Sequence, residues 1–347
     1  MISVAIIGIL LVLILCLVRF QKIVYRKYWN KDLSYNIMSS KKAVFEGETI
    51  TITDSLSNKK SLPLPWLHVS YNFSRFLVYL DNINRKVNRG ERRTLLYIIG
   101  MNKTVSRKSN VLCNKRGYYS VTELVLSCNN LFMTEFTYEK ISNDFELLVY
   151  PKIVDYSESM IPLNKMLGDI TVKRFIDPDP FTFKGIREYQ SYDSFRQINW
   201  KATAKIGDFM SNIYDFTVFQ EITVLLDLQN YKLYNREFVH EEAIRIAAFI
   251  CRSCINKNIP VSMICPSADG SVMKLTGGSS AAHLEKIYTA LAFIDLKKEN
   301  DPVSDIIAEK NDNKEYILIS SFNEKCIIEI SSGNETVTME VRKNVRN

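Results

Sequence analysis

The stretch EITVLLD, residues 221–227, decides the fold of the C-terminal half of the chain. It is almost continuously apolar from Ile222 to Leu226. Strands that are covered on both faces have this pattern, whereas strands with one face in water alternate apolar and polar residues. The stretch therefore predicts a buried strand in a sheet that other elements cover.

After this strand, the sequence alternates between helix and strand patterns. A helix is predicted for residues 236–256, with apolar residues on one stripe: Phe238, Ile244, Ala247, Ala248, Cys251 and Ile255. A strand over 261–265, a helix over 280–295 and a strand over 316–320 follow. The alternation predicts an open α/β sheet with helices on both faces.

A different pattern occupies residues 35–150, where apolar residues recur at every second position. Examples are TITIT (49–53), LHVSYNF (67–73) and LVL (124–126). Turn-rich breaks are predicted at 54–60, 82–90 and 114–117. The alternation predicts antiparallel strands in a β-sandwich or a small barrel, without a long helix.

The N-terminus predicts a membrane anchor. Residues 2–18 carry no charge, and about 17 residues is the lower limit for a helix that crosses a bilayer. The run ends without the small residues of a cleavage site, so a removed signal peptide is not expected. The nearby basic residues all follow the run: Arg19, Lys22, Arg26, Lys27 and Lys31. This bias predicts a single-pass protein of the cell membrane, with its N-terminus outside and its bulk in the cytoplasm.

Length and composition limit the classes of protein that fit. The chain has 347 residues, 46% of them hydrophobic, which predicts about two domains. The net charge of +7 is modest for this length and does not require a nucleic-acid partner. Seven scattered cysteines do not form a disulfide framework and fit a reducing compartment. The patterns divide the chain into an anchor with a basic juxtamembrane segment (1–30), a β-sandwich-like domain (31–155), a connecting segment (156–215) and an α/β domain (216–347).

Few residues offer recognisable catalytic chemistry. The histidines, His68, His240 and His283, have no partner at the spacing of a zinc site. Cys251 and Cys254 form a CxxC pattern near the end of a predicted helix, where the helix dipole disfavours a thiolate. They are interpreted as small apolar residues of a core face. No nucleophile has a visible base nearby, so catalysis is not expected.

Three further stretches have both a structural and a functional interpretation. GGSS (277–280) is interpreted as a turn with an N-cap rather than as an anion site, because it lacks the Walker lysine. The basic run RKVNRGERR (85–93) is interpreted as a solvated loop, with anionic lipid or nucleic acid as alternative ligands. The carboxylates of DPDP (177–180) lie between prolines and are interpreted as part of a loop that joins domains.

The stretch GIREYQSYDSFRQINWKATAK, residues 185–205, mixes aromatic and charged side chains and fits a catalytic centre, a nucleic-acid site or a structural lock. Asp193 is predicted to cap a short helix from residue 194 to about residue 204. Arg187 and Arg196 flank Asp193, and an arginine fork can hold a carboxylate or a carbonyl while it stacks on Trp200 or Tyr189. The stretch is interpreted as a structural lock, meaning side-chain contacts that fix the backbone between two domains.

The same residues carry a resemblance to the DUF58 family of bacterial membrane-associated proteins. Its signature is matched by Gly185-x-Arg187-x-Tyr189 and Asp193-x-x-Arg196-x-Ile198-Asn199-Trp200-x-Ala202-x-Ala204-Lys205, followed by a strand that ends in Asp227. The N-terminal span, EGE (46–48), LPLPWL (62–67) and RGY (116–118) fit in order. The resemblance implies a von Willebrand factor A-like α/β domain behind a β-sandwich. It also implies partnership with a MoxR-type AAA+ ATPase.

The chain departs from that family pattern in three ways, the first of which is a single evident membrane span where the family often has two. A metal-binding A domain has DxSxS after its first strand, because hydroxyl and carboxylate oxygens together coordinate magnesium. Here the run is DLQNY (227–231), in which only Asp227 and Gln229 offer side-chain oxygens at those spacings. Any magnesium site would therefore be incomplete. Tyr192 also stands where the family has glycine, so the turn before Asp193 must be built differently.

The sequence therefore predicts a non-enzymatic, membrane-anchored interaction protein without a cofactor. The resemblance alone implies its purpose, which is to work with a MoxR-type AAA+ ATPase in the assembly or maturation of a complex. The alternative is a metal-dependent ligand-binding A domain, or an enzyme, that uses Asp227. Nucleic-acid binding through residues 85–93 is a third hypothesis, although no such partner is expected.

Overall fold

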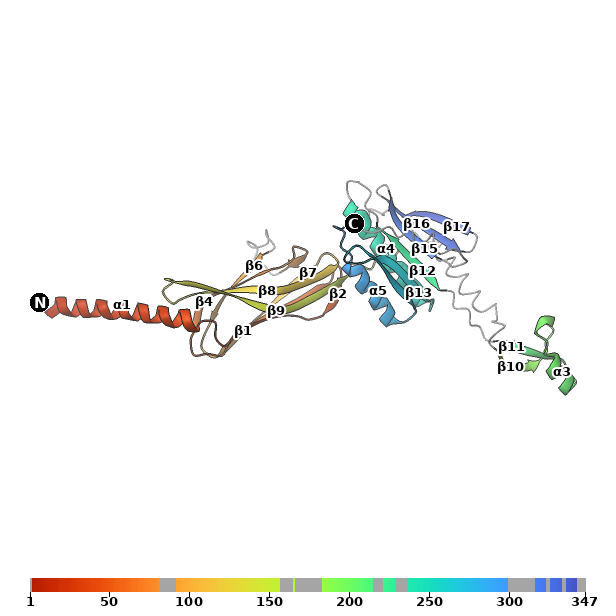
Figure 1. Ribbon diagram of the computed structural model, residues 1–347, viewed down its shortest axis with the longest axis horizontal. Helices are drawn as coiled ribbons and strands as arrows, with labels where there is room; N and C mark the ends of the chain where they lie inside the picture. Colours follow the sequence, from red (N-terminus) through yellow and green to blue (C-terminus); the bar gives the residue numbers. More distant parts are fainter. Residues whose placement is uncertain are drawn as a thin grey trace. The chain divides into compact units, whose positions relative to one another are not determined.

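The computed structural model describes residues 2–80, 92–156, 165, 183–214, 221–228, 236–298, 316–322, 325–332 and 335–341. The chain divides into two compact units, residues 1–152 and 153–347 (Figure 1). The boundary falls close to the end of the β domain that the sequence predicts. Each unit is described by itself below.

Unit 1 contains two sheets. The first has the order β1-β3-β7-β5 and consists of β1 (Leu33–Ser39), β3 (Thr49–Asn58), β7 (Lys103–Cys113) and β5 (Leu77–Tyr79). The second has the order β2-β9-β8-β4-β6 and consists of β2 (Ala43–Phe45), β9 (Phe136–Tyr150), β8 (Gly117–Asn129), β4 (Leu64–Asn72) and β6 (Arg92–Ile99). Neighbouring strands are antiparallel except β2 and β9, which are parallel.

The two sheets share one hydrophobic core, so the unit is a β-sandwich rather than a barrel. Ile52 and Leu56 of β3 belong to this core, as do Leu67 of β4 and Leu126 of β8, and all four are fully buried. Burial alternates along the strands, as β6 shows from Arg92 to Ile99. The apolar period of two in the sequence therefore gives each strand one face toward the core.

The helix α1 (Ile2–Tyr28) precedes the sandwich and is long and apolar enough to cross a membrane. Its last turns belong to the folded unit, because Gln21, Tyr25 and Trp29 recur every four residues and are buried. The hydroxyl of Tyr25 donates a hydrogen bond to the carbonyl of Pro63 at 2.6 Å. One face of the helix end is thus fixed to the sandwich.

Unit 2 is built on a mixed six-stranded sheet with the order β14-β13-β12-β15-β16-β17. The strands are β12 (Ile222–Asp227), β13 (Val261–Pro266), β14 (Val272–Gly278), β15 (Tyr316–Phe322), β16 (Lys325–Ser332) and β17 (Glu335–Val341). β12 pairs in parallel with β13 and β15, and the remaining pairs are antiparallel. The predicted strands at 221–227, 261–265 and 316–320 are confirmed, whereas β14, β16 and β17 make the unit richer in strands than predicted.

Two helices cover this sheet, α4 (Arg236–Asn256) and α5 (Ala281–Phe293), and both match predicted helices. They contact each other as well as the sheet, so they lie on the same face. The prediction of helices on both faces is therefore not met by the residues that the structure describes. The opposite face carries a smaller apolar cluster: Leu225, Ile264, Val272, Tyr316 and Leu318.

Candidate functional site

Residues 183–214 form a small folded segment, here called the motif module. Its strands β10 (Phe183–Glu188) and β11 (Met210–Tyr214) pair antiparallel, and the 3-10 helix η2 (Phe195–Gln197) and α3 (Trp200–Ile206) lie between them in the chain. Asn199 caps α3 by accepting a hydrogen bond from the backbone of Ala202 at 2.9 Å. Gly207 ends α3 with a φ of 95°, a left-handed conformation that favours glycine.

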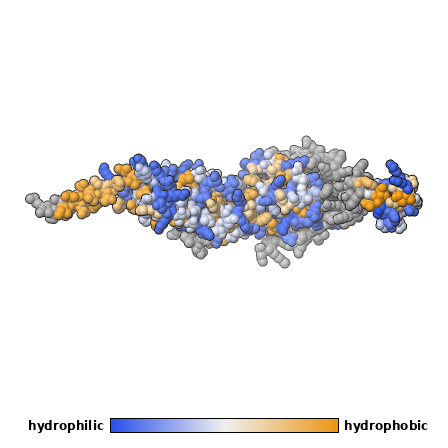
Figure 2. Space-filling model, turned by 90° about the horizontal axis from the view of Figure 1, so that it is seen from below, coloured by the Kyte–Doolittle hydropathy of each residue, from blue (hydrophilic) through white to orange (hydrophobic). Residues whose placement is uncertain are grey.

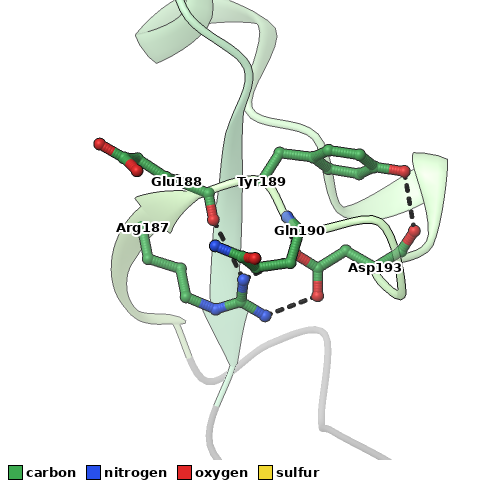
Figure 3. A network of polar contacts seen from close by, with 5 residues as sticks. All are labelled: Arg187, Glu188, Tyr189, Gln190 and Asp193. Carbon is green, nitrogen blue, oxygen red and sulfur yellow. Dashed lines mark hydrogen bonds and ion pairs between the residues drawn. The ribbon is translucent and has the colours of Figure 1, made fainter.

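Arg187 and Asp193 form the central contact of the motif module, here called the clamp (Figure 3). Nη2 of Arg187 lies 2.5 Å from Oδ1 of Asp193, and Nη1 lies 2.7 Å from Oδ2. The backbone N–H of Gln190 donates to Oδ2 at 2.9 Å, and the hydroxyl of Tyr189 donates to the carbonyl of Asp193 at 3.0 Å. The two-point ion pair sets both the distance and the orientation of the loop that follows β10.

The clamp also lowers the pKa of Asp193. The hydrogen bond from Arg187 holds this pKa below its usual value of 3.8, and the N–H of Gln190 acts in the same direction. A carboxylate whose pKa is lower in the folded state contributes stability above its unfolded pKa and loses it as the pH falls through the folded pKa. The clamp should therefore open only in acid, below pH 3.8.

This expectation is testable by nuclear magnetic resonance. The guanidinium protons of Arg187 should shift on acidification in the unchanged protein, and Asp193→Asn should abolish that transition because no carboxylate remains to be protonated. Glu188→Gln is the matched control, since Glu188 is an exposed acid on the same strand. A transition that survives in Asp193→Asn would show that another group controls Arg187.

The structure corrects the predicted helix of residues 194–204. Asp193 is not its cap, because its carboxylate is held by Arg187. Ser194 instead caps η2, and Asn199 caps α3. Between them Ile198 is extended, buried and paired with Ser211, so burial of this side chain interrupts the helix that local spacing favours.

The aromatic partners in the motif module also differ from the prediction. The guanidinium of Arg187 lies 5.5 Å from the ring centroid of Tyr192, not over Tyr189 or Trp200. Trp200 instead makes an edge contact with Phe209, with the ring centroids 6.4 Å apart. The predicted stack of an arginine on Trp200 is therefore wrong.

The other two residues of the predicted lock have simple environments. Arg196 is exposed, and its backbone N–H bonds to the hydroxyl of Ser194. Gly185 lies where the pairing of β10 with β11 shifts register, and a Cβ at this position would meet no atom within 4 Å. Neither residue contributes to the clamp.

Exposed apolar side chains, four of them aromatic, gather in the motif module and are here called the aromatic surface. Its members and their exposed fractions are Tyr192 (79%), Phe195 (77%), Trp200 (65%), Ile206 (59%) and Phe209 (58%). Figure 2 shows this hydrophobic surface in orange on the part that carries α3 in Figure 1. Clusters of exposed large apolar side chains mark interaction sites, and aromatic residues contribute most to binding there.

Asp227, the predicted metal ligand, lies at the C-terminal end of β12 in register with Ser320 of β15. Ligand sites in parallel sheets form at such strand ends. Gln229, Asn230 and Tyr231, the rest of the predicted run, lie outside the described residues. Among the residues that the structure covers, no three His, Cys, Asp or Glu side chains gather at a metal-binding distance. These residues alone do not fit a magnesium site.

The CxxC pattern is part of the core of unit 2. Cys251 and Cys254 lie in α4 and are fully buried. Burial raises the pKa of the Cys254 thiol to about 12, which opposes the thiolate that redox chemistry needs. The geometry agrees with the interpretation of this pair as small core residues.

The predicted N-cap in the GGSS stretch is confirmed, whereas its two glycines end strand β14 and do not form the predicted turn. The hydroxyl of Ser280 accepts a hydrogen bond from the backbone N–H of His283 at 3.1 Å and caps α5. Gly278 allows a close approach, because a Cβ there would lie 2.7 Å from Cγ of His283. The side chain of His283 bonds to the carbonyl of Val261 at 2.7 Å, which connects α5 to β13.

Unit 1 contains a buried charged pair that the sequence pattern does not predict. The side chain of Asp54 is fully buried, and its Oδ2 lies 3.7 Å from Nη2 of Arg93. The hydroxyl of Tyr71 donates to Oδ1 of Asp54 at 3.3 Å, and Arg93 lies 3.5 Å from the ring centroid of Tyr79. Burial raises the pKa of Asp54, and the charge of Arg93 opposes that rise.

These positions correct two predictions. Asp54 was expected in a break over 54–60, but β3 continues to Asn58. Arg93 was expected in a solvated loop over 85–93, but it lies in β6 and is 7% exposed. Residues 85–91 of that basic run, and the DPDP stretch at 177–180, lie outside the described residues.

The described parts together define a class of protein: an apolar N-terminal helix, a β-sandwich, a motif module with an aromatic surface, and a mixed sheet covered by helices. Residues 185–317 match the family model DUF58, described as a protein of unknown function. The match begins in β10 and ends in β15, and it supports the resemblance to DUF58 over that part of the chain.

Other comparisons add little. No curated protein matches the chain. Among solved structures, the third cohesin of ScaC from Acetivibrio cellulolyticus is 13% identical, with 34% of this chain and 98% of that chain covered and a TM-score of 0.24. The bacterial hydrophobin BslA is 13% identical, with 34% and 95% covered and a TM-score of 0.22. Similarities this low carry no argument about fold or function.

Proposed function

We propose that this protein is a membrane-anchored adaptor, without catalytic activity of its own, that binds an AAA+ ATPase of the MoxR type. The observation that carries the proposal is the exposed aromatic surface beside the clamp, including Tyr192, Phe195 and Trp200. The clamp holds the loop before η2 in one conformation. A surface that is already ordered loses less conformational entropy on binding, which favours a protein partner.

The resemblance to DUF58 supplies the class of partner and the role in assembly or maturation of a complex. We propose that the sheet of unit 2 is a von Willebrand factor A-like domain. The parallel strands β13, β12 and β15, with α4 between β12 and β13 in the chain, support this proposal. Domains with such a sheet present ligand sites at the carboxyl ends of their strands, where Asp227 lies.

The orientation in the membrane follows from charge. We propose that the N-terminus lies outside and that the chain after α1 lies in the cytoplasm, because the basic residues follow the apolar run. Two of them, Arg26 and Lys27, lie in the last turn of α1. In the proposed topology the motif module would lie in the compartment that contains ATP.

The proposal is tested by affinity purification of the tagged full chain from gently solubilised membranes of its own host. The expected result is recovery of an AAA+ ATPase, with the amount changed by a non-hydrolysable ATP analogue. Recovery of the protein alone under both conditions would contradict the adaptor proposal. Magnesium titration of the unchanged protein and of Asp227→Ala would then test the alternative site.

A further inference from the structure

The turn between β8 and β9 presents three consecutive apolar side chains to solvent. Leu131, Phe132 and Met133 are 50%, 57% and 55% exposed. Large apolar side chains are scattered singly on most protein surfaces, whereas an adjacent group marks an interaction with another molecule or with a membrane.

This turn is held in one conformation by its own hydrogen bonds. The side-chain oxygen of Asn130 accepts from the backbone N–H of Thr134 at 2.8 Å, and its amide donates to the hydroxyl of Thr134 at 2.7 Å. The backbone N–H of Met133 also bonds to the carbonyl of Asn130 at 3.0 Å. Because Asn130 is 2% exposed, the turn is anchored from the inside while its apolar tip points outward.

The turn lies beside the helix that is long enough to cross a membrane. Nζ of Lys22 lies 3.9 Å from Oε1 of Glu135, at the end of the turn. The last uncharged residue of the apolar run, Val18, precedes Lys22 by four residues, which is about 6 Å along a helix. The turn therefore lies close to the level at which the apolar run ends.

A second turn at the same end of the sandwich adds to this surface. The pairs Leu64↔Ile99 and Trp66↔Asn129 place the ends of β6 and β8 beside the start of β4. Met101, in the turn after β6, is 55% exposed.

We propose that Leu131, Phe132, Met133 and Met101 form an apolar collar that inserts into the lipid interface around α1. The proposal rests on the membrane anchoring by α1 proposed above. Two observations favour lipid as the occupant: the collar adjoins the apolar helix, and Lys22 and Lys103 near it are basic and exposed. Interfacial apolar side chains lie about 5–10 Å deep, and nearby basic residues attract anionic headgroups.

The collar would also restrict how the sandwich tilts relative to the membrane. A single helix with an exposed connection would let the attached domain tilt freely. Here Tyr25 and Trp29 fix the helix end to the sandwich, and the collar adds further contacts with the bilayer beside it. Unit 1 would therefore keep one orientation relative to the membrane surface.

The test uses the full chain reconstituted in vesicles of phosphatidylcholine and phosphatidylglycerol, with acyl chains brominated near the headgroup end. Phe132→Trp should lose emission in brominated vesicles, measured as the difference from the protein with its own tryptophans. Met133→Trp is an independent second probe if the first variant misfolds. Met38→Trp is the matched control. Met38 is 57% exposed, as the collar residues are, but it lies in β1, where it pairs with Thr53 of β3.

Flotation of the vesicles separates the two proposals. If the protein floats and the tryptophan at position 132 is quenched while that at position 38 is not, the collar is in the lipid interface. If the protein floats but neither collar probe is quenched, the collar proposal is wrong and the anchor stands. Failure of the unchanged protein to float would overturn both.

Discussion

The Asp54→Ala variant should lose about 3–5 kcal/mol of unfolding free energy, because the change leaves a buried cation without its partner. Arg93 is 7% exposed and lies in the core-facing row of β6. An arginine cannot shed its proton in a protein, so the charge persists when the carboxylate is removed. Urea unfolding, followed by the fluorescence of Trp66 in β4, measures the loss in unit 1.

Replacing Arg93 instead of Asp54 should lower the free energy of unfolding by less, and the size of the loss should depend on pH. In Arg93→Met the carboxylate of Asp54 loses its counter-charge, so its pKa, which burial already raises, rises further. An acid whose pKa is higher in the folded state takes up a proton on folding. Stability is then greatest below the unfolded pKa and falls as the pH rises through the folded pKa. Acidification from above the folded pKa of Asp54 to below its unfolded pKa should therefore stabilise Arg93→Met relative to the unchanged protein.

The double variant Asp54→Leu with Arg93→Met separates the charge from the packing. Apolar residues of similar volume often replace a buried ion pair at no cost, so this variant should approach the stability of the unchanged protein. Equal destabilisation in all three variants would show that side-chain shape, rather than uncompensated charge, makes Asp54 important.

The period of two was enough to predict antiparallel strands in a β-sandwich or a small barrel, but not to interpret two charged interruptions of the pattern. Asp54 continues the inward series Ile50 and Ile52, and Arg93 continues the series of Leu95 and Tyr97. The same alternation places both charges inside. The turn-rich and basic composition around them favours a turn and a loop. A charge is almost never fully buried unless it is paired, and here the partner lies on another strand. Pairing between distant strands is the information that a single sequence does not provide.

The motif module shows a similar limit. The sequence predicts that an arginine beside Asp193 holds a carboxylate or a carbonyl, but it does not choose between Arg187 and Arg196 and it assigns Asp193 to a helix cap. It did not predict which large apolar side chains are exposed, because Trp200 and Ile198 have the same apolar character in the sequence. In the structure Ile198 is 6% exposed and Trp200 is 65% exposed. The bridge between Ile198 and Ser211 determines the difference, and it depends on how β11 returns beside η2.

The second large effect is expected for Trp200→Ala, which should weaken binding of the ATPase without lowering thermal stability. A tryptophan at the centre of an interface contributes at least about 2 kcal/mol, which corresponds to about thirtyfold in affinity. Because Trp200 is 65% exposed and meets Phe209 in an edge contact, little packing should be lost in the free protein. The amount of ATPase recovered by affinity purification, together with the melting temperature, measures both quantities.

Tyr138→Ala is the matched control, since Tyr138 is 70% exposed but lies in β9 of unit 1. It should retain the ATPase fully.

Arg187→Ala should weaken recovery as well, because the loop that carries Tyr192 and Phe195 would lose its fixed geometry. The decisive comparison is between Trp200→Ala and the unchanged protein. A lower melting temperature with normal recovery would mean that the aromatic surface packs against this chain itself, and the lock predicted from the sequence would then describe its role better than an adaptor surface.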